Sequence, residues 1–467
     1  MDKQSLQIYF DSVAEQRPRW KRKNRYYHEL LKKYFSFIVP ENAKVLEIGC
    51  GTGDLLASIK PTRGLGVDFS AKIIEIAKSN HPDLEFLIQD AEILKISETF
   101  DYIILSDLVG SLWDVQAVFD SLQDVCHNRT KVIISYYNYM WDPLMGLGEI
   151  LKIKLKQPLQ NWLSQKDIIN ILALTGFETI RVDKKIIIPK YLPLFSWFFN
   201  SCVANLPFIR NLSLINFIVA RPINEEINEY SVSIIVPARN EKGNIENVIL
   251  QTPSFGSNQE FIYVEGNSMD GTYEEMCKVK LKYPLKTIKI IKQSGTGKGN
   301  AVREGFEIAK GDILFILDSD LTTPPGDLPK FYEALRRNKG EFINGCRLVY
   351  PMEKQAMRFL NLIANKFFGV LFSFLLGQRL KDTLCGTKVL FKKDYELIKN
   401  NRSYFGDFDP FGDFDLLFGA AKLNLKIVEV NVRYKDRQYG TTQISRFRHG
   451  WLLIKMAFFA SRKLKFF

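Results

Sequence analysis

Residues 314–325 read LFILDSDLTTPP, and this stretch decides how the second half of the chain folds. Four apolar residues run into two aspartates one residue apart, Asp318 and Asp320, before a Pro-Pro pair stops the chain. The pattern predicts a buried strand that ends with two carboxylates at the carboxyl edge of a parallel sheet, where open α/β sheets bind ligands. We expect no basic side chain to pair with these acids.

Two adjacent carboxylates repel each other unless a cation joins them. We expect Asp318 and Asp320 to bind Mg²⁺ or Mn²⁺, because these ions prefer oxygen ligands. Such an ion stabilises the charge that develops on a departing diphosphate. The pair therefore indicates nucleotide-diphosphate chemistry.

Short apolar runs alternate with helical patterns on both sides of a polar, acidic segment at 222–230. This alternation is typical of βαβ units and parallel sheets, and 467 residues exceed a single hydrophobic core. We therefore predict two different α/β domains. The expected strands are 44–49, 64–69, 84–90, 100–107 and 131–137 in the first half, and 232–241, 261–266, 287–293 and 312–320 in the second. The expected divisions are a first domain at 1–222, a linker at 223–230, a second domain at 231–443 and a tail at 444–467.

Composition excludes several classes of protein. The six cysteines are widely spaced without a CxxC pair, which argues against a disulfide framework or a zinc site and suits a reducing cytosol. The N-terminus lacks the basic and then apolar run of a signal peptide. No run reaches about 18 uninterrupted apolar residues. Segments 359–377 and 451–460 come near but are interrupted by Asn or Lys.

The net charge of +12 is concentrated at the C-terminus. Residues 444–467 hold six basic residues and no acid, interleaved with Phe, Trp and Leu. This pattern predicts a helix in an anionic membrane interface, and hence a cytoplasmic protein with peripheral membrane contact. The alternative is a solvated helix packed on its own domain. The aliphatic content of the tail argues against nucleic-acid binding.

A glycine-rich turn follows the first strand of the first half. Residues 45–56 read VLEIGCGTGDLL, with Gly49, Gly51 and Gly53 in a GxGxG spacing and Glu47 before them. Glycines permit a tight turn and let backbone N–H groups approach a ligand closely. A dinucleotide fold would instead place the third glycine one residue later.

This motif resembles the first motif of class I S-adenosylmethionine (SAM)-dependent methyltransferases, a Rossmann-like fold. The resemblance implies that Asp68, which ends the second strand, accepts both ribose hydroxyls of the cofactor. It also implies that Asp90 and Ala91 lie at the adenine, and residues 100–107 (FDYIILSD) look like the family's fourth motif. An α/β domain with glycine turns and no ligand is the alternative.

The methyl acceptor is left open by the sequence. His28, His81 and His127 are candidate bases, although each also fits a surface or packing role, and residues 136–139 (YYNY) fit an acceptor pocket or the core. The basic and aromatic run at 17–27 fits a solvated helix face better than a cofactor cover or a contact with acidic lipid. Residues 186–220 are rich in apolar and aromatic side chains and fit a lid over a lipid-like substrate or a domain interface.

The second half resembles the GT-A glycosyltransferases of family 2, and among them the dolichol-phosphate mannose or glucose synthases. The resemblance covers residues 232 to about 445. The motifs that carry it are VSIIVPARNE, FIYVEGNSMDGT, GTGKGNAVREGF, LDSDLTTPP, LCGTKVLF and YKDRQYGTTQI. It implies metal-dependent, inverting transfer of a sugar from a UDP- or GDP-linked donor to a polyprenyl phosphate.

The resemblance also implies site residues. Asp318 and Asp320 would hold the metal, with Asp320 also catalytic. The other residues implied to bind the nucleotide sugar are Pro237, Arg239 and Glu241 at the base and ribose, Glu265 in place of the family's first aspartate, Lys298, and Arg347 and Arg437 at the phosphates. The sequence departs from the family at Thr322, where a glutamine is usual, at Gln443, where a lysine is usual, and at Arg239, where an aromatic is usual.

Acidic residues at 405–417 (FGDFDPFGDFDLL) mark the acceptor side. By resemblance Asp413 and Asp415 form an acidic pair that opens a helix, and Asp413 is the candidate general base. A phosphate acceptor would need no base, so Asp413 is either base or positioning residue. Asp382 (KDTLCG) is expected to be structural or near the acceptor.

The leading hypothesis is therefore a fused, two-enzyme chain that uses SAM in its first half and a nucleotide-diphosphate sugar in its second. In the alternative, the glycosyltransferase acts on a soluble sugar or glycan, and the first half is a degenerate SAM-binding module.

Overall fold

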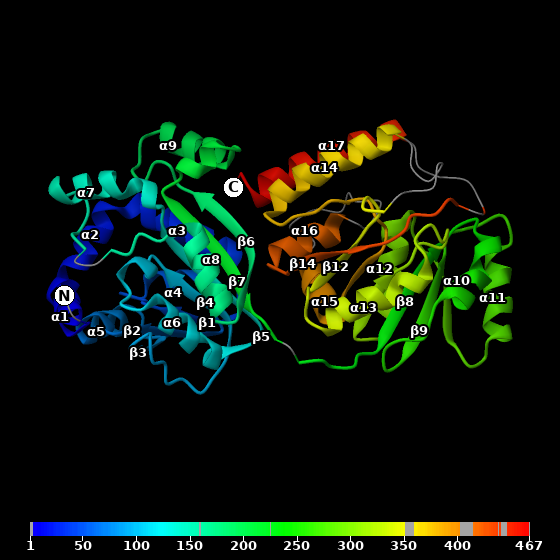
Figure 1. Ribbon diagram of the computed structural model, residues 1–467, viewed down its shortest axis with the longest axis horizontal. Coiled ribbons are helices and arrows are strands. Elements are labelled where there is room, and N and C mark those ends of the chain that lie inside the picture. Colours follow the sequence, from blue (N-terminus) through cyan, green and yellow to red (C-terminus); the bar gives the residue numbers. More distant parts are fainter. Residues whose placement is uncertain are drawn as a thin grey trace. The chain divides into compact units, whose positions relative to one another are not determined.

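The computed structural model confirms the predicted fold class, with two α/β units along the chain (Figure 1). It describes residues 3–157, 160–224, 226–350, 359–401, 414–437, 439 and 446–466. The first unit comprises Met1–Ile223 and the second Asn224–Lys465. The division between the units falls in the polar segment at 222–230.

A seven-stranded sheet in the order β3-β2-β1-β4-β5-β7-β6 forms the centre of the first unit. Its strands are β1 (Lys44–Ile48), β2 (Arg63–Asp68), β3 (Glu85–Ile88), β4 (Phe100–Ser106), β5 (Cys126–Tyr137), β6 (Phe177–Lys185) and β7 (Ile215–Pro222). The first five pair in parallel, while β7 runs antiparallel to both β5 and β6. Because sequential parallel strands require crossovers, their carboxyl ends meet at one edge of the sheet.

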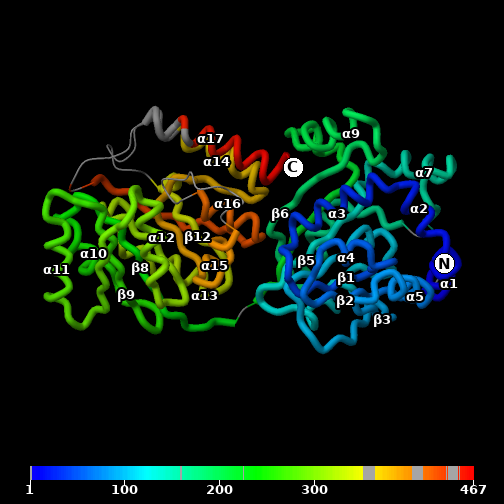
Figure 2. Tube along the Cα trace, turned by 180° about the vertical axis from the view of Figure 1, so that it is seen from behind, coloured from blue at the N-terminus to red at the C-terminus, as the bar shows by residue number. Residues whose placement is uncertain are grey.

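Helices cover this sheet, as the tube in Figure 2 shows from behind. They are α1 (Lys3–Val13), α2 (Arg17–Lys23), α3 (Arg25–Ile38), α4 (Asp54–Ile59), α5 (Ala71–Asn80), α6 (Val115–Ser121), α7 (Asp142–Ile150), α8 (Gln165–Leu174) and α9 (Phe195–Trp197). The core lies between sheet and helices, and strand residues such as Leu46, Ile103 and Ile134 are fully buried in it. Continuous apolar runs are what a parallel strand covered on both faces requires.

The second unit contains a mixed sheet in the order β10-β9-β8-β11-β13-β12-β14. Its strands are β8 (Val232–Ala238), β9 (Gln259–Glu265), β10 (Thr287–Lys292), β11 (Ile313–Ile316), β12 (Phe342–Cys346), β13 (Lys388–Phe391) and β14 (Ile427–Asn431). Strands β8 to β11 are mutually parallel, and β13 runs antiparallel between β11 and β12. The strand predicted from LFILDSD is thus β11, near the middle of the sheet.

The helices of the second unit are α10 (Ile245–Gln251), α11 (Thr272–Lys282), α12 (Lys298–Ile308), α13 (Leu328–Arg336), α14 (Phe359–Leu376), α15 (Lys392–Asn400), α16 (Phe414–Lys422) and α17 (Arg446–Leu464). Helices α14 and α17 correspond to the two near-apolar segments of the sequence, and they pack side by side (Figures 1 and 2). Among the described residues, no helix is both long and apolar enough to cross a bilayer.

Candidate active sites of the two units

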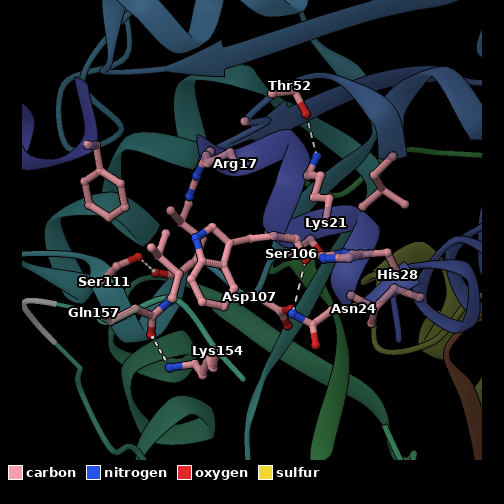
Figure 3. Close-up of a pocket in the computed structure, with 18 of the residues that line it drawn as sticks. Arg17, Lys21, Asn24, His28, Thr52, Ser106, Asp107, Ser111, Lys154 and Gln157 are labelled. Carbon is pink, nitrogen blue, oxygen red and sulfur yellow. Dashed lines mark hydrogen bonds between the residues drawn. The ribbon is translucent and has the colours of Figure 1, made fainter. Parts of the chain in front are cut away.

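A cavity of about 760 Å³ opens at the carboxyl edge of the first sheet. Its walls come from the glycine-rich turn after β1, from the ends of β2 and β4, and from helices α1, α2, α3 and α7 (Figure 3). Every lining residue belongs to the first unit. The volume lies within the range of pockets that hold small molecules and cofactors.

The glycine-rich turn forms the floor of this cavity. Gly49 and Gly53 have φ values of 70° and 76°, which only glycine adopts at little cost. A Cβ on Gly49 would lie 2.6 Å from Leu108, and one on Gly53 would lie 2.6 Å from Phe86. The turn therefore leaves no room for a side chain at Gly49 or Gly53, and its backbone lies beside the cavity.

Glu47 is the buried carboxyl beneath this turn. Its Oε2 accepts a hydrogen bond of 3.0 Å from the backbone N–H of Leu56 in α4. Burial raises the pKa of Glu47 to about 8, although the charge of Lys21 opposes the change. The carboxyl is therefore mainly protonated at neutral pH.

Asp68 and Asp90 both line the cavity, as does Ala91. The backbone N–H of Gly51 donates to one oxygen of Asp68 and that of Ser70 to the other, each over 3.1 Å. Burial raises the pKa of the Asp68 carboxyl, against the charge of Arg17. Asp90 forms an ion pair with Lys3, and one of its oxygens accepts the backbone N–H of Glu92.

The basic and aromatic run at 17–27, which we expected to be a solvated helix face, does expose four basic residues but also covers the cavity. It forms α2 and the start of α3, and Tyr27 lines the cavity. Arg17 and Lys21 line it as well (Figure 3). Lys21 Nζ lies 2.6 Å from both Thr52 Oγ1 and Asp54 Oδ2 at the glycine-rich turn. The charge pattern alone could not show that this run covers the cavity, because the residues that pair with its cations come from other segments of the chain.

The three candidate histidines lie in different places. His28 lines the cavity, and burial together with the charge of Lys21 lowers its pKa to about 4. His81 pairs with Asp54 at 3.2 Å outside the cavity lining, and His127 pairs with Asp101 at the opposite ends of the strands. Only His28 is positioned to act in the cavity, and its imidazole is neutral at pH 7.

Asp107 is a cavity residue that sequence reasoning missed. It follows β4, accepts hydrogen bonds from Tyr27 (2.5 Å) and Ser135 (3.0 Å), and has a φ of 51°. Burial raises the pKa of this carboxyl. The available signal was its place at the end of FDYIILSD, the same position that Asp68 takes after β2.

In the second unit, each aspartate of the pair is bonded to a cation, contrary to our expectation. Asp318 Oδ1 lies 2.6 Å from Lys298 Nζ, at the first residue of α12. Asp320 Oδ2 lies 2.6 Å from a terminal nitrogen of Arg437, whose other terminal nitrogen lies 3.0 Å from Glu241. The sequence did not reveal these pairs because Arg437 stands 117 residues from Asp320.

The surroundings fix both carboxylates. Thr322, where the resemblance leads one to expect a glutamine, donates its hydroxyl to Asp320 Oδ1 over 2.7 Å. Burial would raise the pKa of Asp318, but the nearby charges of Lys298, Lys388 and Arg347 hold it below its ordinary value. The carboxyl of Asp318 therefore stays ionised at neutral pH.

Gly386 allows Asp318 and Lys298 to meet. A Cβ at this position would lie 2.0 Å from Asp318 Oδ2 and 2.5 Å from Lys298 Nζ. A glycine is thus required at this position of LCGTKVLF because any side chain would collide with Asp318 and Lys298. The motif alone did not show this.

Arg347 is oriented by Asp382. Its Nε and one terminal nitrogen donate to the two carboxylate oxygens over 2.7 and 2.9 Å, and Asn365 of α14 donates to Asp382 over 2.9 Å. The pKa of Asp382 falls to about 2 because the charge of Arg347 outweighs the effect of burial. Asp382 is thus a positioning residue, and Asn365 interrupts the apolar segment because it serves this network.

The remaining predicted residues of the second unit lie around β8 and β9. The carbonyl of Pro237 accepts the hydroxyl of Ser319, and Arg239 is exposed beyond it. Glu265 ends β9 and is buried, with its carboxylate accepting the backbone N–H of Ser268 over 2.6 Å. Asp415 is buried in the first turn of α16. The predictions for Asp407, Asp409, Asp413 and Gln443 fall outside the described residues.

The donor set of the aspartate pair fits a divalent cation. Among the described residues, no group of three or more His, Cys, Asp or Glu side chains could hold a metal. Mg²⁺, however, is usually bound by one or two carboxylates and completed by water and substrate phosphates. Asp318 and Asp320 supply such a partial set.

Two family models match the chain. The model described as "Methyltransferase domain" matches residues 19–182, and the one described as "Glycosyl transferase family 2" matches residues 233–398. The chain joins a methyltransferase domain to a family 2 glycosyltransferase domain. Each match coincides with one of the two units.

Curated relatives align with the glycosyltransferase domain. A dolichol-phosphate mannosyltransferase from Pyrococcus furiosus is 36% identical over 120 residues, which is 25% of this chain and 33% of that protein. The corresponding protein of Saccharomyces cerevisiae is 37% identical over 113 residues, or 23% of this chain and 41% of that one. Glycosyltransferase AglJ of Haloferax volcanii is 27% identical over 48% of this chain and 69% of its own length. The chain thus spans less than half the length of the two mannosyltransferases.

Solved structures of both kinds of enzyme show similarity to parts of this chain. A SAM-dependent methyltransferase from Thermotoga maritima shares 16% identity over 46% of this chain and 98% of its own, with a TM-score of 0.37. Glucosyl-3-phosphoglycerate synthase from Mycobacterium tuberculosis shares 18% identity over 50% of this chain and 80% of its own, with a TM-score of 0.38.

The raised pKa of Glu47 makes a prediction about the pH dependence of stability. In the unfolded chain this group ionises near pH 4.5, whereas in the folded state it keeps its proton to about pH 8. The folded state binds more protons between these values, so this group's contribution to stability falls as the pH rises from about 4.5 to 8. In the Glu47→Gln variant the side chain cannot ionise, so this loss of stability with rising pH should be absent.

Thermal unfolding of the full chain at pH 5, 7 and 8.5 measures this effect. The difference in melting temperature between Glu47→Gln and wild type should move in favour of the variant as the pH rises. Glu41→Gln, on an exposed turn, is the matched control. A difference that does not change with pH would contradict the assignment of a raised pKa.

Proposed function

We propose that the glycosyltransferase domain transfers a sugar from a UDP- or GDP-linked donor to a polyprenyl phosphate, with a divalent cation at Asp318 and Asp320. The observation that carries this proposal is the arrangement at the end of β11, where two carboxyl groups pair with Lys298 and Arg437. Carboxylates for a metal beside cations for phosphates are what a metal–diphosphate ligand requires. The similarity to dolichol-phosphate mannosyltransferases supports the lipid acceptor.

Each side chain then has a defined role. A divalent cation, when bound, would neutralise charge on the departing nucleotide diphosphate. Lys298 and Arg437, which pair with the aspartates in this structure, would turn to the phosphate oxygens. The planar guanidinium of Arg437 suits two oxygens at once, and Lys298 acts at the N-terminus of α12, where negative charge is favoured. The other terminal nitrogen of Arg437 would remain paired with Glu241.

A lipid acceptor fits the helices next to this site. Phe367 and Val370 of α14 and Trp451 and Phe458 of α17 are exposed, and α17 also carries basic residues. Apolar and basic side chains together favour an anionic membrane interface. Helix α14 also reaches the site, because its Asn365 donates to Asp382, which orients Arg347. We infer peripheral contact of this domain with the cytoplasmic face of the membrane.

The acceptor determines what Asp413 does. A phosphate acceptor is already an anion and needs no proton removed, so Asp413 would then position it. A hydroxyl acceptor would need a general base, and Asp413 is our candidate for that role.

For the methyltransferase domain we propose SAM as the methyl donor. The cavity combines a glycine-rich turn with the carboxyl groups of Asp68 and Asp90, so Asp68 would accept the ribose hydroxyls and Asp90 and Ala91 would lie at the adenine. SAM, when bound, would supply an activated methyl group. Alignment of the acceptor with that group is the main requirement of the transfer. His28 lines the cavity, but a pKa lowered to about 4 makes its imidazole a weak base.

A donor panel tests sugar transfer. Purified protein with Mn²⁺ and polyprenyl phosphate should release nucleotide diphosphate from one of several UDP- and GDP-sugars. Asp320→Asn should reduce the rate by about 100-fold, because half of the metal's carboxylate set is lost. Asp312→Asn, at the opposite end of β11, should leave the rate unchanged. Release that does not depend on lipid would favour a soluble sugar or glycan acceptor, and no release from any donor would refute the proposal.

Gly386 provides a second test of the same site. Gly386→Ala should displace Asp318 from Lys298 and lower kcat/KM by about tenfold or more, since misplaced catalytic groups have effects of that order. Gly326→Ala is the control, because no atom lies within 4 Å of a Cβ at that position. Equal activity of the two variants would show that the Asp318–Lys298 contact is dispensable.

Calorimetry with SAM tests the other domain. Wild type should bind SAM, and Asp68→Asn should weaken binding by about 10- to 100-fold, the usual cost of losing hydrogen bonds to a charged group. Asp83→Asn, in an exposed turn of the same domain, is the matched control. An unchanged dissociation constant for Asp68→Asn would remove Asp68 from the site.

A further inference from the structure

The segment between β6 and β7 exposes an unusual number of large apolar side chains. Leu194 and Phe208 are 82% and 87% exposed, and both have positive φ values. Their exposure means that folding gains little from burying them, and positive φ is costly for bulky residues. The fold of the first unit therefore does not explain why these positions are apolar. We call the exposed side chains Tyr191, Leu194, Phe195, Trp197, Phe198 and Phe208 the insert face.

Helix α7 extends this apolar surface toward the cavity. Its Leu144 and Leu147 are exposed and also line the cavity. The Trp141 indole donates to the carbonyl of Leu212 over 2.9 Å, which ties the start of α7 to the insert. Figures 1 and 2 both place α7 and α9 along the same edge of the unit as α2. The insert face is thus one side of a surface that adjoins the cavity mouth.

Helix α2 adds positive charge to the same surface. Lys190 of the insert donates to Asn24 Oδ1 over 2.6 Å, and the rings of Tyr26 and Tyr191 are 5.6 Å apart. These contacts place the run RPRWKRKNR (17–25), which holds six basic residues and no acid, beside the insert. Burial and the charge of Lys23 both lower the pKa of Lys190. The segment 186–220 likewise contains basic residues but no Asp or Glu.

We propose that the insert face, with the neighbouring basic residues of α2, docks the methyltransferase domain on an anionic lipid bilayer. Three observations identify lipid as the occupant: exposed Trp, Tyr and Phe suit the headgroup region, Lys and Arg complement acidic lipids, and acids are absent from both segments. This surface belongs to a different domain from α14 and α17. Docking would hold the cavity mouth against the bilayer.

Vesicle binding by the full chain tests the inference without donor, SAM or acceptor. It can therefore fail or succeed independently of the proposed reactions. The vesicles are phosphatidylcholine, with and without phosphatidylglycerol, and carry brominated acyl chains that quench tryptophan on contact. The fluorescence of Trp197 is obtained as the difference between wild type and Trp197→Phe, and that of Trp451 in α17 as the difference from Trp451→Phe.

With phosphatidylglycerol present, we expect brominated lipid to quench Trp197 by about half or more, as for a ring inserted into the interface. The double variant Leu194→Ser/Phe208→Ser should weaken vesicle binding through this surface by about tenfold or more and reduce that quenching. The matched control is Leu281→Ser/Leu285→Ser, which changes two exposed leucines of the second unit.

Two outcomes would overturn the inference. The first is binding that quenches Trp451 but not Trp197, which would mean that the C-terminal helix alone contacts lipid. The second is no binding to either kind of vesicle. That result would indicate that the insert face contacts a protein partner or the second unit of the chain instead of lipid.

Discussion

The pairing of two carboxylates with two cations at the end of β11 is the constraint on which the second unit's site depends. Asp318 and Asp320 come from one strand end, whereas Lys298 begins α12 and Arg437 follows β14. Without these cations, the adjacent charges would repel each other in a partly desolvated place. Gly386 leaves the space in which Asp318 and Lys298 meet, and Thr322 fixes the second carboxylate. The charges of the site thus balance one another, and under the proposed function the metal would pair with the aspartates and the diphosphate with Lys298 and Arg437.

The first unit stabilises its carboxyl groups by other means. Glu47, Asp68 and Asp107 stand at the carboxyl ends of adjacent parallel strands, and backbone N–H groups or hydroxyls donate to each. Burial raises the pKa of all three. Such groups are suited to neutral hydrogen-bond partners such as ribose hydroxyls. Both domains thus have their candidate site at the carboxyl edge of parallel strands, in keeping with a general property of α/β sheets.

Much of this organisation could be predicted from the sequence because it is local. The apolar runs that end in glycine or aspartate marked the strands, and the fold class followed from their alternation. Contacts between distant segments could not be predicted: Arg437 reaches Asp320 and Asn365 reaches Asp382 only once the sheets and helices are packed. For the same reason, the cover that α2 and α3 form over the cavity was only the weaker alternative from the sequence, since a basic run is usually solvated. The apolar segment at 186–220 was noticed, but composition alone could not separate a lid or an interface from an exposed surface.

Titration of Mn²⁺ in the presence and absence of UDP or GDP tests the central claim most directly. If Lys298 and Arg437 balance the aspartates until a diphosphate arrives, Mn²⁺ alone should bind weakly, and one of the two nucleotides should strengthen its binding by about tenfold or more. By linkage, Mn²⁺ should strengthen binding of that nucleotide by the same factor. Equal Mn²⁺ affinity with and without both nucleotides, or binding unaffected by Asp320→Asn, would contradict the account.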